Sequence, residues 1–428
     1  MDTLPEYSLL DDATRECPFR YFQTIRAEQP VYFMPELGVY YVSRYEDVRY
    51  VKKNPELFSN DTSKTSSRSS ARDIAEEYRS EHGWARVSTL QRTDPPIHGC
   101  YRKLIDGAFP VRRIRTMTSY IETIVNDLID EFIDAGSCEF VSEFSVPLPC
   151  TVIADQLGVP RSKLPELKAW SDAMLAPGGG FVDDSAAIDC AKLVVQAQKF
   201  FASVIEARRD EPRDDIISDL VQAQFDDGSG AAPRALSMPE LQDLLDQLLT
   251  GGNETTTSAI GSALLLLLQR PGLADQLRAD DKRLRAFIEE SLRYETPVLH
   301  LWRVATEDTQ LGGVDIPKGA SLALGYASAN RDEAVFDDSE TFDVNRPKPG
   351  AHLAFGSGPH HCPGAALARQ EMFSAFKILL ARLHHIELTV PVDELTHAPS
   401  IFLRGLTRLP IRFDVLQRER YEPGACVF

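Results

Sequence analysis

Ten residues, from Phe355 to Gly364, surround the cysteine whose neighbours most favour chemistry. They read Phe-Gly-Ser-Gly-Pro-His-His-Cys-Pro-Gly. Proline is favoured at the first position of a helix, and good helix formers run from Pro363 to about Leu383. Cys362 therefore lies at a predicted helix N-terminus, where free N–H groups and the helix dipole favour an anion. The sequence predicts a thiolate of lowered pKa that is suited to bind a metal.

Two other interpretations of this loop remain open. A Gly-rich turn can begin a helix and leave a buried free cysteine beside it. His360, His361 and Cys362 are adjacent and offer ligands for zinc, although zinc sites usually draw on separated pairs of ligands. The glycines favour a third interpretation, in which the loop binds a flat ring. Gly356 lacks a Cβ at the turn, and Gly364 lets such a ring lie close to the backbone.

A second stretch, residues 248–257, reads Leu-Leu-Thr-Gly-Gly-Asn-Glu-Thr-Thr-Thr. Apolar and small residues recur around it at helical spacing, which predicts one long helix. Gly251 and Gly252 each cost about 1 kcal/mol relative to Ala inside a helix, so another group should need the space. Glu254 and Thr255 offer a carboxylate and a hydroxyl for proton transfer beside that gap. The alternative is a kinked core helix whose Thr bonds its own backbone.

A third group combines charges that could pair. Glu290 and Arg293 are three residues apart and share a helix face, and Arg346 ends the stretch Phe-Asp-Val-Asn-Arg. An exposed pair of this kind adds little stability, so these residues alone indicate nothing specific. The same holds for three further cations, which are common on protein surfaces: His98, Arg102 and Arg303.

Together these motifs resemble the cytochrome P-450 family. The loop matches FGxGxHxCxG of that family at every specified position, and residues 248–257 look like its distal helix. The resemblance extends from the predicted hairpin at 30–42 to the last strands, so it covers nearly the whole chain. It implies a mainly α fold with a minor β part (α+β), built as a single domain over residues 1–428 with a long distal helix and a cysteine-ligand loop.

The resemblance also implies a cofactor, haem b (iron protoporphyrin IX), and roles for these residues. Cys362 would be the axial ligand of the iron. Thr255 would hold the iron-bound oxygen and Glu254 would supply protons. The residues expected to contact the haem, its propionates or dioxygen are His98, Arg102, Gly251, Gly252, Arg303, Phe355, His360 and Gly364. Glu290, Arg293 and Arg346 would form a structural network below the haem.

The implied activity is the insertion of one oxygen atom from dioxygen into a small lipophilic substrate such as a terpenoid, steroid, fatty acid or aromatic. The chain has no flavin or dinucleotide motif, so we expect a ferredoxin and an NAD(P)H-dependent ferredoxin reductase as electron donors. Candidate docking cations are Arg112, Arg113 and Arg369. The alternatives are desaturation or oxidative coupling, use of peroxide, and a haem-binding protein without turnover; the acid–alcohol pair counts against the last two.

The pocket residues are placed by their position relative to the motifs, and plain core packing is the alternative for each. They are Gln247, Thr250, Val298, Leu299, Ile401 and Phe402, with residues 84–90 as a roof. Gln247 and Thr250 could bond a polar group of the substrate.

The rest of the chain limits the class of protein. Of its 428 residues 43% are hydrophobic, and the net charge is −18, which argues against nucleic-acid binding through phosphate contacts. No apolar run approaches the roughly 20 residues of a membrane span, and residues 1–10 lack a signal or anchor pattern. Seven cysteines without paired spacing favour the cytoplasm, and we expect a monomer. Residues 60–80, which are Ser- and charge-rich, are predicted to form a surface loop.

Overall fold

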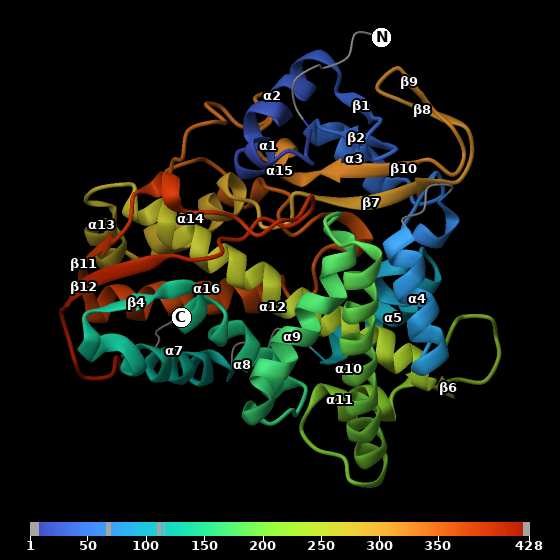
Figure 1. Ribbon diagram of the computed structural model, residues 1–428, viewed down its shortest axis with the longest axis horizontal. Helices are drawn as coiled ribbons and strands as arrows, with labels where there is room; N and C mark the ends of the chain where they lie inside the picture. Colours follow the sequence, from blue (N-terminus) through green and yellow to red (C-terminus); the bar gives the residue numbers. More distant parts are fainter. Residues whose placement is uncertain (1–7, 66–69, 109–112, 114–115, 423–428) are drawn as a thin grey trace.

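The computed structural model describes residues 8–65, 70–108, 113 and 116–422. Helices make up most of it, and strands form smaller sheets, so the predicted α+β class is confirmed (Figure 1). The helices are α1 (Asp12–Glu16), α2 (Phe19–Glu28), α3 (Tyr45–Lys53), α4 (Ser70–His82), α5 (Ile97–Ala108), α7 (Thr118–Phe132), α8 (Pro147–Gln156), α9 (Leu164–Leu175), α10 (Asp184–Asp210), α11 (Ile216–Gln222), α12 (Met238–Leu268), α13 (Leu273–Ala279), α14 (Asp281–Tyr294), α15 (Tyr326–Ala329) and α16 (Ala365–Arg382).

Strands form one five-stranded sheet and smaller ones. Their bounds are β1 (Val31–Met34), β2 (Val39–Val42), β3 (Phe58–Ser59), β4 (Ser137–Glu139), β5 (Gln224–Phe225), β6 (Arg234–Ala235), β7 (His300–Ala305), β8 (Thr309–Leu311), β9 (Val314–Ile316), β10 (Ser321–Gly325), β11 (Leu383–Leu388) and β12 (Pro410–Val415). The large sheet has the order β1-β2-β10-β7-β3. The predicted hairpin is its β1–β2 pair, and β10 joins β2 in parallel with Ser321 opposite Val39.

The long helix α12 crosses the middle of the molecule in Figure 1, between the β-rich part and the layer of α7 to α11. It begins at a capping box in which Ser237 and the side chain of Glu240 satisfy each other's backbone N–H groups. Its 31 residues span about 46 Å at 1.5 Å per residue. The second half is buried in the main hydrophobic core with α7, α14 and α16. This helix therefore links the pocket region to the rigid core.

The prediction of a loop at residues 60–80 is wrong in its second half, because residues 70–82 form α4. This helix packs along α10, so tertiary contacts stabilise a helix that its Ser-rich surroundings did not predict. The short strands β3, β4, β5, β6 and β8 were also not predicted. Each has only two or three residues, too few for an alternating pattern.

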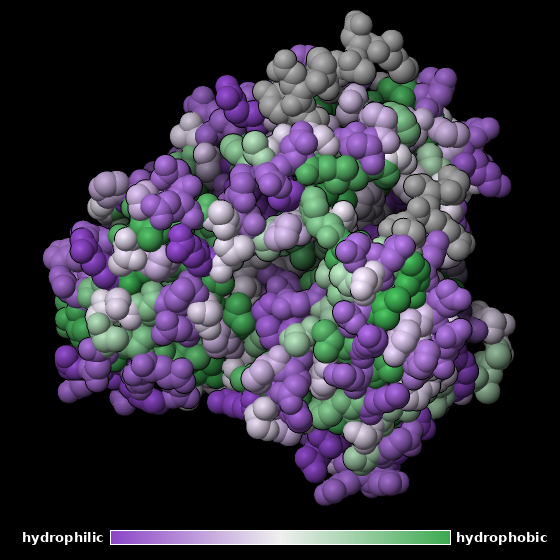
Figure 2. Space-filling view, viewed as in Figure 1, coloured by the Kyte–Doolittle hydropathy of each residue, from purple (hydrophilic) through white to green (hydrophobic). Residues whose placement is uncertain are grey.

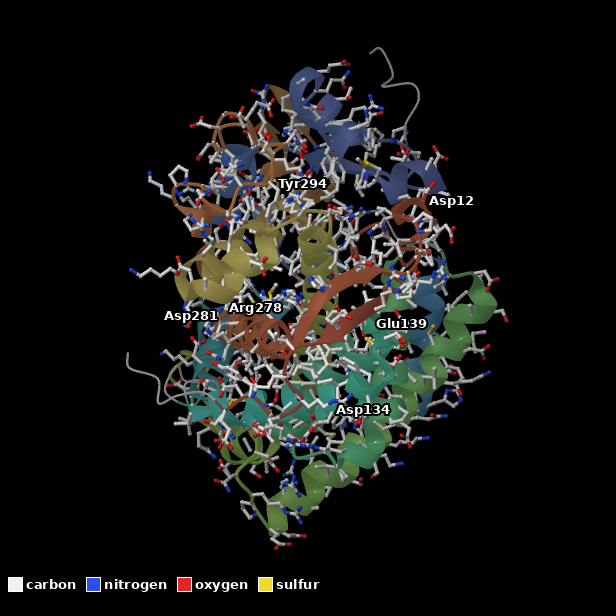
Figure 3. The ribbon with its side chains drawn as sticks, turned by 90° about the vertical axis from the view of Figure 1, so that its left-hand side faces the viewer. Asp12, Asp134, Glu139, Arg278, Asp281 and Tyr294 are labelled. Carbon is white, nitrogen blue, oxygen red and sulfur yellow. The ribbon has the colours of Figure 1, made fainter. Side chains whose placement is uncertain are left out.

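The sheet β11-β12-β4 covers one side of α16. Figure 3 shows it with Glu139, which accepts hydrogen bonds from the N–H groups of Ser142 and Leu409 and so fixes β4 to the segment before β12. Arg278, also labelled there, donates to the carbonyl of Leu380 at 2.7 Å. These contacts hold α13 and α16 together around the core.

Among the described residues, no helix combines the length and the apolar character needed to cross a membrane. Figure 2 shows that hydrophilic residues dominate one face of the molecule, that apolar residues are scattered between them, and that the surface is hollowed near its centre.

Candidate functional site

The cysteine loop closes on itself before α16 begins. The Cys362 N–H donates to the carbonyl of Phe355 at 2.9 Å, which brings the two ends of the loop together. Gly356 and Gly358 both have φ near +67°, a left-handed conformation that favours glycine. A Cβ at Gly364 would lie 3.9 Å from Cys362 Sγ, so the space beside the sulfur stays open.

The electrostatics of Cys362 differ from the prediction. Burial raises the pKa of the thiol, and the N–H groups of Gly364 and Ala365 with the charges of Arg102 and Arg369 only partly oppose it. The helix N-terminus favours the thiolate as expected, but desolvation of the sulfur wins while no cation lies against it. The prediction of a lowered thiol pKa is therefore wrong for the protein by itself, and a cationic metal centre would reverse it.

Two buried cations lie close to this loop without a carboxylate partner among the described residues. Arg303 of β7 donates to the carbonyl of Trp302 at 2.6 Å, and burial lowers its pKa. Lys52 of α3 donates to the Tyr326 hydroxyl at 2.9 Å, and a Cβ at Gly356 would lie 3.0 Å from its Nζ. Burial lowers the pKa of Lys52, and the positive charge of Arg303 adds to this. Isolated charges of this kind are costly, so the site requires negative charge from elsewhere.

Two histidines complete the cluster. The rings of His98 and His360 lie 3.8 Å apart between centroids. Burial, helped by the charges of His98, Arg303 and Lys52, lowers the pKa of His360 to about 2, so its ring is neutral. Its Nε2 is buried and has no hydrogen-bond partner. Such orphaned atoms call for an explanation, and a missing ligand supplies one.

These features fit a haem better than any other group that the motifs suggested. Two propionates would satisfy Lys52, Arg303 and the His360 nitrogen together, and the cysteine sulfur would bind the iron. Among the described residues, no group of three or more His, Cys, Asp or Glu side chains is arranged to hold a metal ion by itself. A single cysteine suits a haem, because the macrocycle supplies the other ligands. Sequence reasoning missed Lys52 and Tyr326, because neither belongs to a motif.

The remaining predicted haem contacts lie around this cluster. Arg102 donates to the Asp106 carboxylate at 2.8 Å and to the His361 carbonyl, so it is bonded to the protein rather than free. The Arg369 guanidinium lies over the ring of Phe355, and its Cζ is 4.3 Å from the ring centroid.

Glu290, Arg293 and Arg346 form a buried network. Arg293 donates to both oxygens of Glu290 at 2.7 and 2.8 Å, and Arg346 Nε lies 3.2 Å from both. The N–H groups left over donate to backbone carbonyls, among them that of Thr341. The network therefore ties α14 to the irregular segment that leads to the cysteine loop.

The glycine pair on α12 has two different environments. A Cβ at Gly251 would meet nothing within 4 Å, whereas one at Gly252 would lie 3.3 Å from Ile153 of α8. Gly251 thus opens onto free space, and Gly252 allows α12 and α8 to pack closely. The Thr255 hydroxyl donates to the Gly251 carbonyl at 2.9 Å, which leaves its oxygen free to accept hydrogen bonds.

Glu254 is turned toward α9. Its Oε1 lies 3.3 Å from Lys168 Nζ and 3.1 Å from Asn253 Nδ2. Burial raises its pKa, and Lys168 only partly opposes this while Asp172 reinforces it. The carboxyl group therefore keeps a proton at higher pH than an ordinary glutamate does.

Gln247 and Thr250 are both engaged within the protein. The Gln247 amide donates to Thr89 and Asp243 at 2.8 and 2.6 Å and accepts from the Gln91 N–H. Thr250 donates to a backbone carbonyl of its own helix. Gln247 therefore fastens the segment before α5 to α12, a role that the sequence did not suggest.

The other four predicted pocket residues divide into two pairs. Leu299 and Ile401 are 1% and 5% exposed and belong to a core cluster with α2. Val298 and Phe402 are half-buried, so they keep surface that a ligand can contact. A separate cavity of about 620 Å³ lies between α2 and the second half of α12, with Tyr294 (labelled in Figure 3) at its wall, and none of the predicted site residues lines it.

The arginines considered for docking are paired. Arg369 donates to both oxygens of Glu289 at 2.6 and 2.9 Å, and Arg113 lies 3.4 and 3.3 Å from Asp214 and Asp219. Arg112 lies outside the described residues. The described part of this group is therefore close to neutral rather than a basic patch.

Comparisons with known proteins agree with this geometry. The family model "Cytochrome P450" matches residues 183–409. Cytochrome P450 109 of Bacillus spizizenii is 34% identical over 413 residues, 96% of this chain and 95% of that protein. A steroid C26-monooxygenase of Mycobacterium tuberculosis is 33% identical over 420 residues, 96% and 98% of the two chains. The crystal structure of CYP109E1 from Bacillus megaterium in complex with testosterone has a TM-score of 0.80 at 31% identity and covers 94% of this chain and 99% of its own.

Fold, site and relatives together define a haem-dependent oxygenase. The chain belongs to the cytochrome P450 family, whose members bind haem through a cysteine ligand. It is a monooxygenase of the bacterial type, a group that acts on lipophilic compounds.

Proposed function

We propose that the protein hydroxylates a small lipophilic substrate in the pocket between Gly251, Val298 and Phe402, with haem b held by Cys362. The observation that carries this proposal is a set of three buried groups around the cysteine loop. Arg303 and Lys52 have no counter-charge among the described residues, and the His360 Nε2 has no hydrogen-bond partner. Haem bound through a thiolate supplies the activation of dioxygen. We further propose that one domain spans residues 1–428 and acts as a monomer in the cytoplasm.

The chain's own residues position the reactants and move protons. Gly251 leaves space beside the helix for a small molecule, and the Thr255 oxygen accepts a hydrogen bond there. Glu254 lies beside Lys168 and Asp172 of α9, and burial raises its pKa, so its carboxyl group holds a proton more readily than an ordinary glutamate and can pass it on. These features favour turnover over simple haem binding.

Electrons come, in this proposal, from a ferredoxin that an NAD(P)H-dependent reductase reduces. Because the described arginines considered for docking, Arg369 and Arg113, are paired with carboxylates, docking has to rely on shape or on exchange of these ion pairs. Strong dependence of electron transfer on salt would support exchange.

Two measurements test the proposal. The reduced protein with carbon monoxide is expected to give the red-shifted Soret band of a thiolate-ligated haem, and a histidine-type band contradicts the role of Cys362. Thr255→Ala is expected to release peroxide while NAD(P)H is still consumed. Thr256→Ala, on the buried side of the same helix, is the matched control and should stay coupled; equal coupling in both variants would remove the role of Thr255.

A further inference from the structure

A completely buried asparagine lies in the middle of α12, directly before Glu254. Asn253 is 0% exposed, although asparagine is a poor helix former and a buried amide is costly unless it is hydrogen-bonded. Gly252 lets α8 pack closely against α12 at this point. The Asn253 side chain is therefore enclosed where the two helices meet, and its partners explain its presence there.

The oxygen of this amide accepts a hydrogen bond from a thiol on α8. Cys150 Sγ lies 3.0 Å from Asn253 Oδ1. Burial, to which the charge of Glu254 adds, raises the pKa of this thiol to about 12, so the sulfur keeps its proton. The Thr257 hydroxyl lies 3.5 Å from the same oxygen but has a closer acceptor in the Ser145 carbonyl at 3.1 Å. Because the thiol is the donor, the oxygen of the amide faces α8 and the nitrogen faces away from it.

The nitrogen of the amide donates to the carboxyl group of Glu254. Asn253 Nδ2 lies 3.1 Å from Glu254 Oε1. Two donors of α9 reach the same oxygen, Lys168 Nζ at 3.3 Å and Ser171 Oγ at 3.5 Å. Lys168 is partly exposed and is shared with Asp172, and the serine contact is long for a hydrogen bond. The buried amide is therefore the donor whose position is best defined.

We propose that Asn253 is a positioning residue for proton transfer: its amide, held in one orientation by the Cys150 thiol, fixes the direction of the Glu254 carboxyl group. This inference rests on the proposed function, in which Glu254 supplies protons. Proton transfer depends steeply on the alignment of the donor with the next group, so a carboxyl group that turns freely delivers protons more slowly. Asn253 acts through its neighbour and is not itself an acid or a base.

Infrared spectroscopy of the haem-loaded protein tests the two hydrogen bonds. The S–H stretching band that Cys150→Ala removes belongs to the thiol. The C=O stretching band of the protonated carboxyl group that Glu254→Gln removes belongs to the acid. In Asn253→Leu the thiol loses its acceptor, so we expect its band to move to higher frequency. The pH midpoint of the Glu254 band should rise by about one unit, because an amide N–H favours the ionised carboxylate.

Cys150 offers a second pair of variants that leave α12 itself unchanged. Cys150→Ala removes the donor and should raise the midpoint of the Glu254 band in the same direction as Asn253→Leu, but by less, because the amide remains. Cys150→Ser keeps an O–H donor and should hold the midpoint at the parent value. Cys138→Ala is the matched control: it removes another buried cysteine, on β4, and leaves a cavity, but it should not move the Glu254 band.

NAD(P)H consumption with a ferredoxin and its reductase, in H₂O and in D₂O, supplies the kinetic measurement. Asn253→Leu should lower the rate about tenfold, the worth of one hydrogen bond to a charged group, and enlarge the ratio of the rates in the two solvents. Cys150→Ser should stay near the parent protein, and Cys150→Ala should fall between the two. A general loss of folded protein would lower the rate without enlarging that ratio.

Three results overturn the inference: an S–H band that stays in place in Asn253→Leu, an unchanged midpoint of the Glu254 band, or an equal shift of that midpoint in Cys138→Ala. Glu254→Gln separates this inference from the proposed function. If Glu254→Gln leaves turnover and its solvent isotope effect unchanged, the proposed proton supply fails and the positioning role fails with it. If Glu254→Gln slows turnover and Asn253→Leu does not, only the positioning role is removed.

Discussion

The protein contains two sets of buried cations that differ in one respect. Arg293 and Arg346 share the carboxylate of Glu290, and backbone carbonyls take their remaining N–H groups. Lys52 and Arg303 are just as buried, but each has only one neutral oxygen as an acceptor.

The difference separates structure from function. Where the buried cations share a carboxylate and backbone carbonyls accept their remaining N–H groups, the chain by itself completes the site. Where buried cations have no counter-charge, the folded protein carries a free-energy cost that only a ligand removes. Haem propionates are the ligands that fit. Substitutions in the first set should therefore damage folding, and substitutions in the second should damage cofactor retention.

The largest effect is expected for Glu290→Gln. It leaves Arg293 and Arg346 buried without a counter-charge, which should cost about 3–5 kcal/mol of folding free energy. Urea unfolding measures the loss. Glu387→Gln is the control, because Glu387 and its partner Arg412 are both exposed and the loss should be at most about 1 kcal/mol. Equal losses in the two variants would contradict the comparison.

Arg303→Leu should show the opposite behaviour. Removal of an uncompensated buried charge should leave the haem-free chain at least as stable in thermal unfolding. The haem-loaded protein should release its cofactor about tenfold faster or more, since a hydrogen bond to a charged group is worth about 1.5–3 kcal/mol. Transfer of haem to an acceptor protein measures this rate. Arg346→Leu should instead destabilise the haem-free chain, and the same result for Arg303→Leu would break the distinction.

Lys52→Met is expected to have a smaller effect than Arg303→Leu, because Tyr326 and Arg303 remain in the cluster. Burial alone would raise the pKa of Tyr326, but the charges of Lys52 and Arg303 lower it below its ordinary value. Loss of Lys52 should therefore raise the pKa of Tyr326, which ultraviolet titration of the phenol detects in the haem-free protein. An unchanged titration would show that the charge of Lys52 does not affect the pKa of Tyr326.

Glu371 extends the comparison to a buried acid without a cation. Burial raises its pKa to about 8, and one carboxyl oxygen has no partner. Its folded-state pKa lies above the unfolded value, so the stability it contributes is present below about pH 4.5 and is lost as the pH rises through 8. Glu371→Gln should match the parent protein at pH 4 and become relatively more stable toward pH 8, by at most about 1.4 kcal/mol per pH unit. A difference independent of pH would contradict the raised pKa.

Local patterns predicted much of the fold and of the site. The β1–β2 hairpin, α12 and α16 lie where turn residues and helical spacing place them, because these signals act over a few residues. Lys52 and Tyr326 could not be found in this way, since they are 274 positions apart in sequence and meet only through the β2–β10 pairing. The thiol pKa of Cys362 was predicted in the wrong direction because the sequence shows the helix N-terminus but not the desolvation of the sulfur.

The role of Gln247 illustrates a second limit. Its position relative to the motifs placed it beside the pocket, and a free amide there would suit a substrate. Its donors and acceptor are instead taken by Thr89, Asp243 and Gln91, contacts that depend on where the segment before α5 crosses the helix. The sequence periodicity of one segment does not reveal which residues of another segment will hydrogen-bond to it.

The parallel pairing of β2 with β10 sets a limit on when this protein can assemble. Its two strands lie about 280 residues apart in the chain, so at a synthesis rate of roughly 5–20 residues per second the ribosome needs about 15–60 s to produce the second after the first. During that interval the apolar edge of β2 has no neighbour on that side and is open to wrong partners. Newly made chains should therefore need protection from aggregation until β10 has been made, and haem can be enclosed only after that.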